Sequence, residues 1–229
     1  MRCGQSGATP VADNIDRVEG RKLFGSDPEG YEAARPAYPD WIFDTLIRES
    51  AIYKGARALE IGPGPGTVTR RLLDLGVDPL TLIEPDKRFT RILGRTADAA
   101  SASGALVQQS FEAASLPRDH FDLVVAATSF HWVAPEHGFS KIRRILRSGG
   151  SAALMWNVLQ DLSQEDRFHE ATRELLAPLA SSPSGAPDSV PFALDRSARE
   201  AEAHAAGFDR ISYAESRWSH VITTEQVGK

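Results

Sequence analysis

The sequence predicts an α/β fold of the doubly wound type, with a mainly parallel sheet. Three observations lead to this prediction. Between residues 56 and 157, short apolar runs alternate with stretches of helical periodicity, and the connections are short. The run FDLVVAAT at 121–128 is apolar on both faces, as in a strand that helices cover on both sides. A glycine-rich loop follows the first run, at the sheet edge where such folds bind ligands.

The strands are predicted from the apolar runs and the helices from apolar residues that recur every three or four positions. The five predicted parallel strands are 56–61, 79–85, 105–109, 121–128 and 151–157. The helices between and before them are predicted at 40–50, 67–75, 86–100 and 137–150. Gly76 and Gly149 are expected to end two of these helices, because glycine adopts the left-handed conformation that closes a helix.

Beyond residue 157 the pattern changes. It predicts a helix at 163–179, a flexible Ser/Pro/Gly-rich loop at 180–192, a helix at 197–206 that ends at Gly207, and a sixth strand at 210–223.

The chain is expected to form one domain. Residues 1–22 are small and polar and are predicted to be a flexible N-terminus, while 23–229 form the domain. The segment 158–195 is an insertion after the fifth strand and is expected to act as a lid on the substrate side.

The composition and charge of the chain argue against several classes of protein. The 229 residues carry a net charge of −5, which argues against a nucleic-acid partner. The single cysteine, Cys3, and the lack of a signal peptide or a membrane-length apolar run indicate a cytoplasmic protein without a membrane partner. The histidines have no metal-ligand spacing, so no metal is predicted. A monomer or homodimer is expected.

The glycine loop IGPGPGT restricts the kinds of ligand that can bind beside it. Gly62, Gly64 and Gly66 depart from the G-x-G-x-x-G spacing of dinucleotide sites, and no Lys-Ser/Thr pair completes a phosphate loop. Glu60 lies just before the loop, and its negative charge would repel a pyrophosphate but favour a cationic ligand. Glu84 ends the second strand, where an acid can bind two ribose hydroxyls.

The motif LEIGPGPG resembles the first motif of class I S-adenosylmethionine (SAM)-dependent methyltransferases. The segment FGSDPEGYEAARPAYP, at 24–39, resembles the lead segment of the type 11 small-molecule methyltransferases, the group that contains trans-aconitate methyltransferase. QSFEAASLP, FDLVVAATSFHWV and RILRSGG resemble later motifs of the class. The resemblance implies a Rossmann-like domain that binds SAM, leaves S-adenosylhomocysteine (SAH) as product and methylates a small molecule. It also implies a final helix and strand, for which the sequence offers no segment, so the final strand of the fold is predicted to be missing from the chain.

The resemblance also implies which residues bind the cofactor. Tyr31 is expected over its methionine end, Arg35 near its carboxylate, and Ser110, Phe111 and Glu112 beside its adenine. The full set is Tyr31, Arg35, Glu60, Gly62, Pro63, Gly64, Gly66, Glu84, Pro85, Ser110, Phe111, Glu112, Thr128 and Ser129.

The substrate side is predicted from the residues that follow the fourth and fifth strands. They are Phe130, His131, Trp132, Trp156 and Asn157. His131 is a candidate catalytic base, since its ordinary pKa suits proton removal near neutral pH. The alternative is that His131 and Trp132 form a packed pair, because a carboxylate acceptor needs no base. Two other functions stay open: a non-catalytic SAM-binding protein and an NAD(P)-dependent oxidoreductase.

Overall fold

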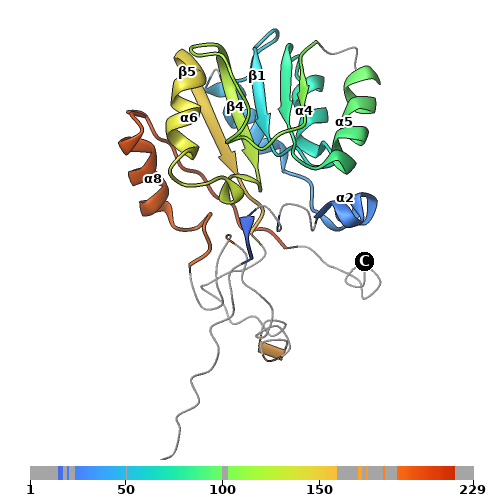
Figure 1. Cartoon of the computed structure of the whole chain (residues 1–229). Helices are drawn as coiled ribbons and strands as arrows, with labels where there is room; N and C mark the ends of the chain where they lie inside the picture. Colours follow the sequence, from blue (N-terminus) through green and yellow to red (C-terminus); the bar gives the residue numbers. More distant parts are fainter. Residues whose placement is uncertain are drawn as a thin grey trace, which may run out of the picture.

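The computed structural model describes residues 15–17, 20, 24–49, 51–99, 103–158, 170–171, 174, 183 and 190–219. A five-stranded sheet forms its centre, in the order β3-β2-β1-β4-β5, and each neighbouring pair is parallel (Figure 1). The strands are β1 (Ala58–Ile61), β2 (Leu80–Ile83), β3 (Leu106–Val107), β4 (Phe121–Ala127) and β5 (Leu146–Met155). The predicted parallel, doubly wound sheet is therefore confirmed.

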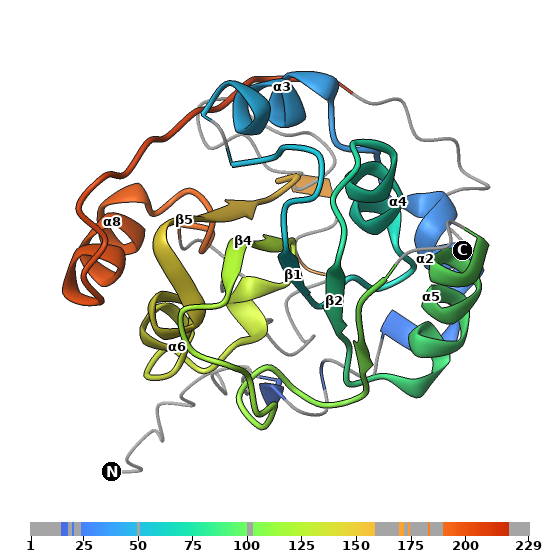
Figure 2. The same cartoon turned by 90° about the horizontal axis from the view of Figure 1, so that it is seen from above.

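Helices cover both faces of the sheet. Seen from above, α3 and α4 lie over one face and α6 and α8 over the other (Figure 2). The helical elements are η1 (Phe24–Ser26), α2 (Pro28–Ala34), α3 (Asp40–Arg48), α4 (Thr67–Asp74), α5 (Lys87–Ala99), η2 (Phe130–Trp132), α6 (Gly138–Ile145) and α8 (Arg196–Ala205). Gly76 and Gly207 have φ angles of +80° and +90° just beyond α4 and α8, as predicted for the ends of these helices.

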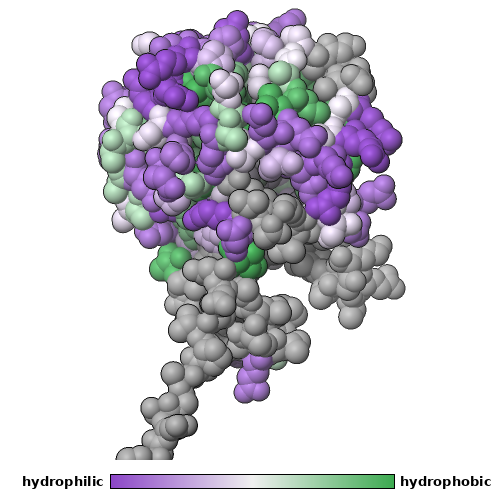
Figure 3. All heavy atoms as spheres, viewed as in Figure 1, coloured by the Kyte–Doolittle hydropathy of each residue, from purple (hydrophilic) through white to green (hydrophobic). Residues whose placement is uncertain are grey.

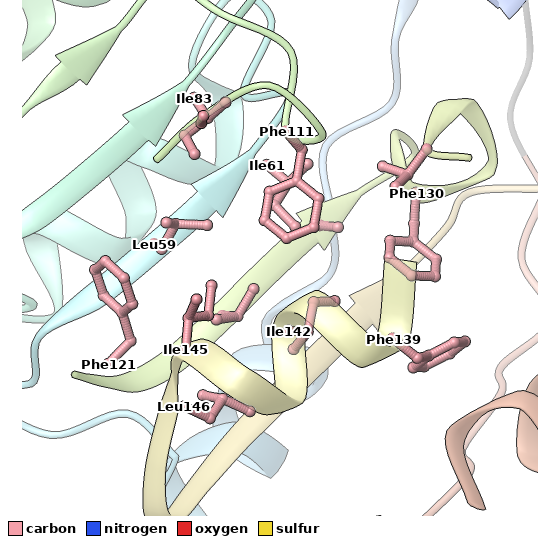
Figure 4. Packing of buried hydrophobic residues seen from close by; sticks show 14 of the residues in the cluster. Leu59, Ile61, Ile83, Phe111, Phe121, Phe130, Phe139, Ile142, Ile145 and Leu146 are labelled. Carbon is pink, nitrogen blue, oxygen red and sulfur yellow. The ribbon is translucent and has the colours of Figure 1, made fainter. Parts of the chain in front are cut away.

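Two buried apolar clusters lie on the two sides of the sheet. Successive residues of β1 point to opposite faces, so Leu59 joins the cluster under α6, whereas Ala58 joins the one under α3 and α4. Figure 4 shows the first cluster, in which Phe111 and Ile142 contribute from a loop and from α6. The two clusters fix the position of the central strands, and hence of the loops at their carboxyl ends.

Leu72 of α4 offers a test of the packing. Its side chain is fully buried against the sheet. We expect Leu72→Ala to lower the free energy of unfolding by about 2–5 kcal/mol, through lost burial and the cavity that remains. Chemical denaturation would measure the change, with Ile47→Ala as the control, because Ile47 is 43% exposed. A loss for Leu72→Ala no larger than that of the control would contradict the assignment.

The junction between α6 and β5 differs from the prediction. The predicted helix 137–150 ends at Ile145, and β5 begins at Leu146 rather than at residue 151. The reason is that the fully buried Leu146 is extended and pairs with Phe121, after which the register shifts until Ser151 pairs with Leu123. Gly149 keeps the predicted positive φ, +73°, but it lies within the irregular part of β5 and does not end a helix.

The prediction of a sixth strand at 210–223 is wrong for the residues of this range that the structure describes. Residues 208–219 form neither helix nor strand. A strand needs a neighbour for its backbone hydrogen bonds, and among the described residues no such pairing with β5 is present. Ile211 and Trp218 are 36% and 43% exposed, so alternating apolar residues alone did not place this segment in the sheet.

Other predictions fall on residues outside those described. They concern most of the N-terminus 1–22, of the loop 180–192 and of the insertion 158–195. Of the predicted helix 163–179, only residues 170, 171 and 174 are described, and they are helical.

The surface is mainly hydrophilic in the view of Figure 3, with hydrophobic atoms in small separate patches. Within the described ranges, no helix has the length and apolar character needed to cross a membrane.

Candidate functional site

A cleft opens at the carboxyl ends of β1, β2 and β4, the edge at which parallel α/β sheets bind ligands. The empty space in and in front of it, including space open to solvent, amounts to about 620 Å³. The residues that line it are Tyr31, Ile61, Gly62, Gly64, Ile83, Glu84, Pro85, Phe89, Ser110, Phe111, Glu112, Thr128, Ser129, Trp132 and Val133. Most of the predicted cofactor residues therefore gather in one place.

Some of the predicted site residues lie outside the lining of the cleft. In the cofactor set these are Arg35, Glu60, Pro63 and Gly66, and in the substrate set Phe130, His131, Trp156 and Asn157. Conversely, sequence reasoning missed Ile61, Ile83, Phe89 and Val133. Ile61 and Ile83 are the last residues of β1 and β2, a position that could have indicated them. Phe89 and Val133 carry no comparable signal in the sequence.

The glycine loop connects β1 to α4 and needs its glycines for two different reasons. Gly62 has φ +63°, and a Cβ there would lie 2.8 Å from Cβ of Ser129, so a side chain does not fit. Gly64 has φ +56°, and a Cβ there would meet no atom within 4 Å, because the position faces the cleft. Gly64 thus leaves open the space in which a ligand can approach the backbone.

Glu60 lies beneath this loop and is 1% exposed. Its Oε2 accepts a hydrogen bond of 2.7 Å from Oγ1 of Thr69, whereas its Oε1 is buried and has no hydrogen-bond partner among the described residues. Burial, and then the nearby Glu84 carboxylate, raise the pKa of Glu60 to about 7, although Thr69 and Arg70 oppose the shift. A buried carboxylate oxygen without a donor is costly unless a ligand supplies one.

Glu84 follows β2 and faces the glycine loop across the cleft. Its Oε2 accepts from the backbone N–H of Gly64 at 3.1 Å, and its Oε1 accepts from the N–H of Asp86 at 2.9 Å. Glu84 is 5% exposed, so these bonds fix its carboxylate in the wall of the cleft. The sequence predicted an acid at this position, but not its bond to the loop.

The helix α2 brings Tyr31 over the cleft from the N-terminal segment. Its ring lies 6.0 Å from that of Phe89, and the guanidinium of Arg35 lies 4.9 Å from the Tyr31 ring centroid. The carboxylate of Glu32 pairs with Arg70, which anchors α2 to α4. Arg35, which was predicted beside the ligand, thus contacts the cleft through Tyr31.

Thr128 and Ser129 follow β4 directly, and hydrogen bonds constrain their conformation. Thr128 has φ +49°, which is uncommon for a residue other than glycine, and its Oγ1 lies 2.5 Å from the Tyr38 hydroxyl. Oγ of Ser129 donates to the carbonyl of Ile61 at 2.5 Å. These bonds connect the end of β4 to β1 and to the N-terminal segment, and they hold the floor of the cleft in one shape.

The predicted substrate residues divide into two groups. Trp132 lines the cleft, whereas Phe130 packs against Phe139 in the core, with ring centroids 4.9 Å apart (Figure 4). Nδ1 of His131 accepts a hydrogen bond of 3.2 Å from Nε1 of Trp156. The amide of Asn157 donates to the carbonyl of Pro36.

His131 is 4% exposed, and its charge state follows from its surroundings. Burial first, and then the positive charges of Arg17 and Arg35, lower the pKa of His131 to about 4. The imidazole is therefore neutral at pH 7. Because Trp156 donates to Nδ1, the proton of the ring lies on Nε2. The ring can therefore donate a hydrogen bond through its Nε2–H. Its lowered pKa makes it a weaker base than a free histidine. Among the described residues, no cluster of His, Cys, Asp and Glu could hold a metal ion.

The parallel sheet, the glycine loop and the acid after β2 define the class I SAM-dependent methyltransferase fold. Residues 59–154 match a family whose description is "Methyltransferase domain". Over these residues the chain is similar to a methyltransferase domain.

The relatives and solved structures agree with this class. The chain is 32% identical over 134 residues to "Uncharacterized methyltransferase Rv3342" of Mycobacterium tuberculosis, covering 58% of this chain and 51% of the relative. It is 31% identical over 154 residues to "Uncharacterized methyltransferase-like C25B8.10" of Schizosaccharomyces pombe, covering 66% and 56%. It therefore spans about half the length of the curated relatives that it matches.

Among solved structures, the fold resembles Phospholethanolamine N-methyltransferase 2 of Haemonchus contortus, in complex with phosphomonomethylethanolamine and SAH. The TM-score is 0.57 at 18% identity, over 85% of this chain and 44% of that one. The YcgJ protein of Bacillus subtilis gives a TM-score of 0.51 at 17% identity, over 73% and 68%. At these identities the likeness shows the fold.

Proposed function

We propose that this protein transfers a methyl group from SAM to a small-molecule acceptor. The observation that carries the proposal is the pair of carboxylates around the glycine loop, Glu60 beneath it and Glu84 across from it. None of the described residues that line the cleft is Lys or Arg, so the cleft suits a ligand with a cationic group and a ribose better than one with a pyrophosphate. The segment 24–39 supports a place in the type 11 group that contains trans-aconitate methyltransferase.

The residues of the cleft fit SAM at several points. The unpartnered Oε1 of Glu60 would accept from the ammonium, directly or through a water. The carboxylate of Glu84 would accept from the ribose hydroxyls. The open space at Gly64 admits the ligand close to the backbone, and the Phe111 ring offers an apolar surface to the adenine.

The protein's part in the reaction would be alignment and exclusion of water. When bound, SAM supplies a methyl group that its sulfonium makes electrophilic. Tyr31 and Trp132 would cover the methionine side of the cleft, and Thr128 with Ser129 would form its floor. His131 would support the Trp132 wall of the cleft from behind, since its ring centroid lies 5.4 Å from that of Trp132.

Two measurements on the full chain test this function. Calorimetry with SAH should show binding, while a parallel titration with NADH should not. Incubation with tritiated SAM and a panel of small acceptors should then give a labelled product. Binding without transfer to any acceptor would favour the non-catalytic alternative, and binding of NADH in place of SAH would favour the oxidoreductase.

The pKa of Glu60 predicts a pH dependence for cofactor binding. Glu60 must be ionised to attract the ammonium, and its pKa lies at about 7. We therefore expect the affinity for SAH to reach its maximum near pH 8, where Glu60 is ionised and the ammonium is still protonated, and to fall about tenfold for each pH unit well below 7. The ligand-free protein should show the opposite trend: because the folded state holds the proton more tightly, stability decreases as pH rises from about 4.5 to 7.

The variant Glu60→Gln tests whether the pH dependence of SAH binding comes from Glu60. It removes the titrating group, so SAH should bind weakly and with little change between pH 6 and 8. Calorimetry in two buffers of different ionisation enthalpy would also count the proton that the parent releases on binding near pH 6. A parent whose affinity does not change between pH 6 and 8 would remove Glu60 from the ligand's surroundings.

A further inference from the structure

We propose that Lys141 of α6 is a positioning residue for the cofactor cleft, because it holds in place the loop that carries Phe111. This inference rests on the proposed function for the identity of the ligand. Lys141 lies outside the lining of the cleft, and nothing in the sequence indicated a role for it at the site.

The loop at 110–114 is a single helical turn. The N–H groups of Ala113 and Ala114 donate to the carbonyl of Ser110, at 3.1 and 3.0 Å. Oγ of Ser110 accepts from the N–H of Ala113 at 3.3 Å, so the side chain caps the start of the turn. An isolated turn of this length is not stable in water, and its carbonyl groups at the other end need donors.

Lys141 supplies these donors. Its Nζ donates to the carbonyls of Phe111, Glu112 and Ala114, at 3.0 Å for Glu112 and 2.6 Å for Ala114. An ammonium has three N–H groups, so these three bonds use all of them. Nζ also lies 5.0 Å from the Phe111 ring centroid, within the range of a cation–π interaction.

The turn forms one wall of the cleft. Ser110, Phe111 and Glu112 line it, and the Phe111 ring is 2% exposed, within the core cluster under α6 (Figure 4). A second attachment holds the turn, because Oε1 of Glu112 accepts from the N–H of Ala134 at 2.9 Å. Without Lys141, the three carbonyls would face one another with no cation between them, and the turn would be held by Glu112 and the Phe111 ring.

We expect Lys141→Met to weaken SAH binding about tenfold. Adenosine should lose affinity by the same factor, since the turn contacts the nucleoside end of the ligand. Lys141→Arg should recover most of the affinity, because a guanidinium can also donate to several carbonyls. Arg143→Met is the matched control: Arg143 is an exposed cation on the same helix, and its loss should leave the affinity unchanged.

Hydrogen–deuterium exchange of the ligand-free protein gives a second readout. The amides of Ala113 and Ala114 should exchange faster in Lys141→Met than in the parent or in Arg143→Met. Should Lys141→Met fail to fold, Lys141→Gln, which keeps two donors, replaces it in the same comparison. An unchanged SAH affinity overturns the proposal even if exchange accelerates. A parent that binds no SAH contradicts the proposed function instead, and the exchange comparison then decides alone whether Lys141 holds the turn.

Discussion

Replacing Gly64 with valine is expected to weaken SAH binding by at least about 100-fold while the chain still folds. Gly64 faces the cleft, and a Cβ at this position would meet no protein atom within 4 Å. The valine side chain would therefore occupy the space in which the ligand approaches the backbone. Gly64→Ala places one methyl group there and should have a smaller effect of the same sign. Calorimetric titration of the parent and both variants would measure the series.

The backbone of Gly64 makes a control necessary. Its φ of +56° is one that valine rarely adopts, so Gly64→Val strains the loop as well as filling the cleft. Gly55 has φ +83°, and a Cβ there would also meet no atom within 4 Å, but this glycine lies at the other end of the sheet, before β1. Gly55→Val should thus lose comparable stability and keep the parent's affinity. Equal losses of affinity in both variants, or none in Gly64→Val, would contradict the placement of the ligand.

The sheet was predictable because its signals are local. Each apolar run of the central parallel strands is buried on both faces, and the glycines at 76 and 207 end their helices as predicted. The predictions fail where pairing with a segment distant in the sequence determines the secondary structure. Leu146 becomes a strand residue because Phe121 pairs with it, whereas residues 210–219 lack a described neighbour and remain irregular in spite of a strand-like pattern.

The residues of the candidate site also divide into those with a local signal in the sequence and those without one. The residues that the motifs indicated at strand ends, such as Gly64, Glu84 and Thr128, lie in one cleft because parallel strands bring their carboxyl ends together. The sequence carried no sign of Phe89 or Lys141, which reach the site or its wall from helices. It also did not indicate that Glu60 is fully enclosed, and this enclosure changes its pKa.

Replacing Glu84 with alanine is expected to weaken SAH binding about 100-fold, because two hydrogen bonds from ribose hydroxyls to a charged acceptor are lost. The fold should persist, since Glu84 belongs to neither of the two buried apolar clusters that hold the sheet. Part of the loss of SAH affinity would come from release of the glycine loop. Glu84→Gln separates the two contributions, as its amide oxygen can still accept from Gly64 while the negative charge is gone.

A comparison of ligands isolates the contact with the sugar. The parent should bind adenosine more tightly than 2′,3′-dideoxyadenosine, which lacks both hydroxyls. Glu84→Ala should bind the two nucleosides with similar affinity, because the group that distinguishes them is absent. Asp86→Ala serves as the control: Asp86 adjoins the same wall, but its carboxylate bonds to Arg88. That variant should keep the parent's preference for adenosine. If Glu84→Ala discriminates between the nucleosides as strongly as the parent does, Glu84 does not bind the ribose.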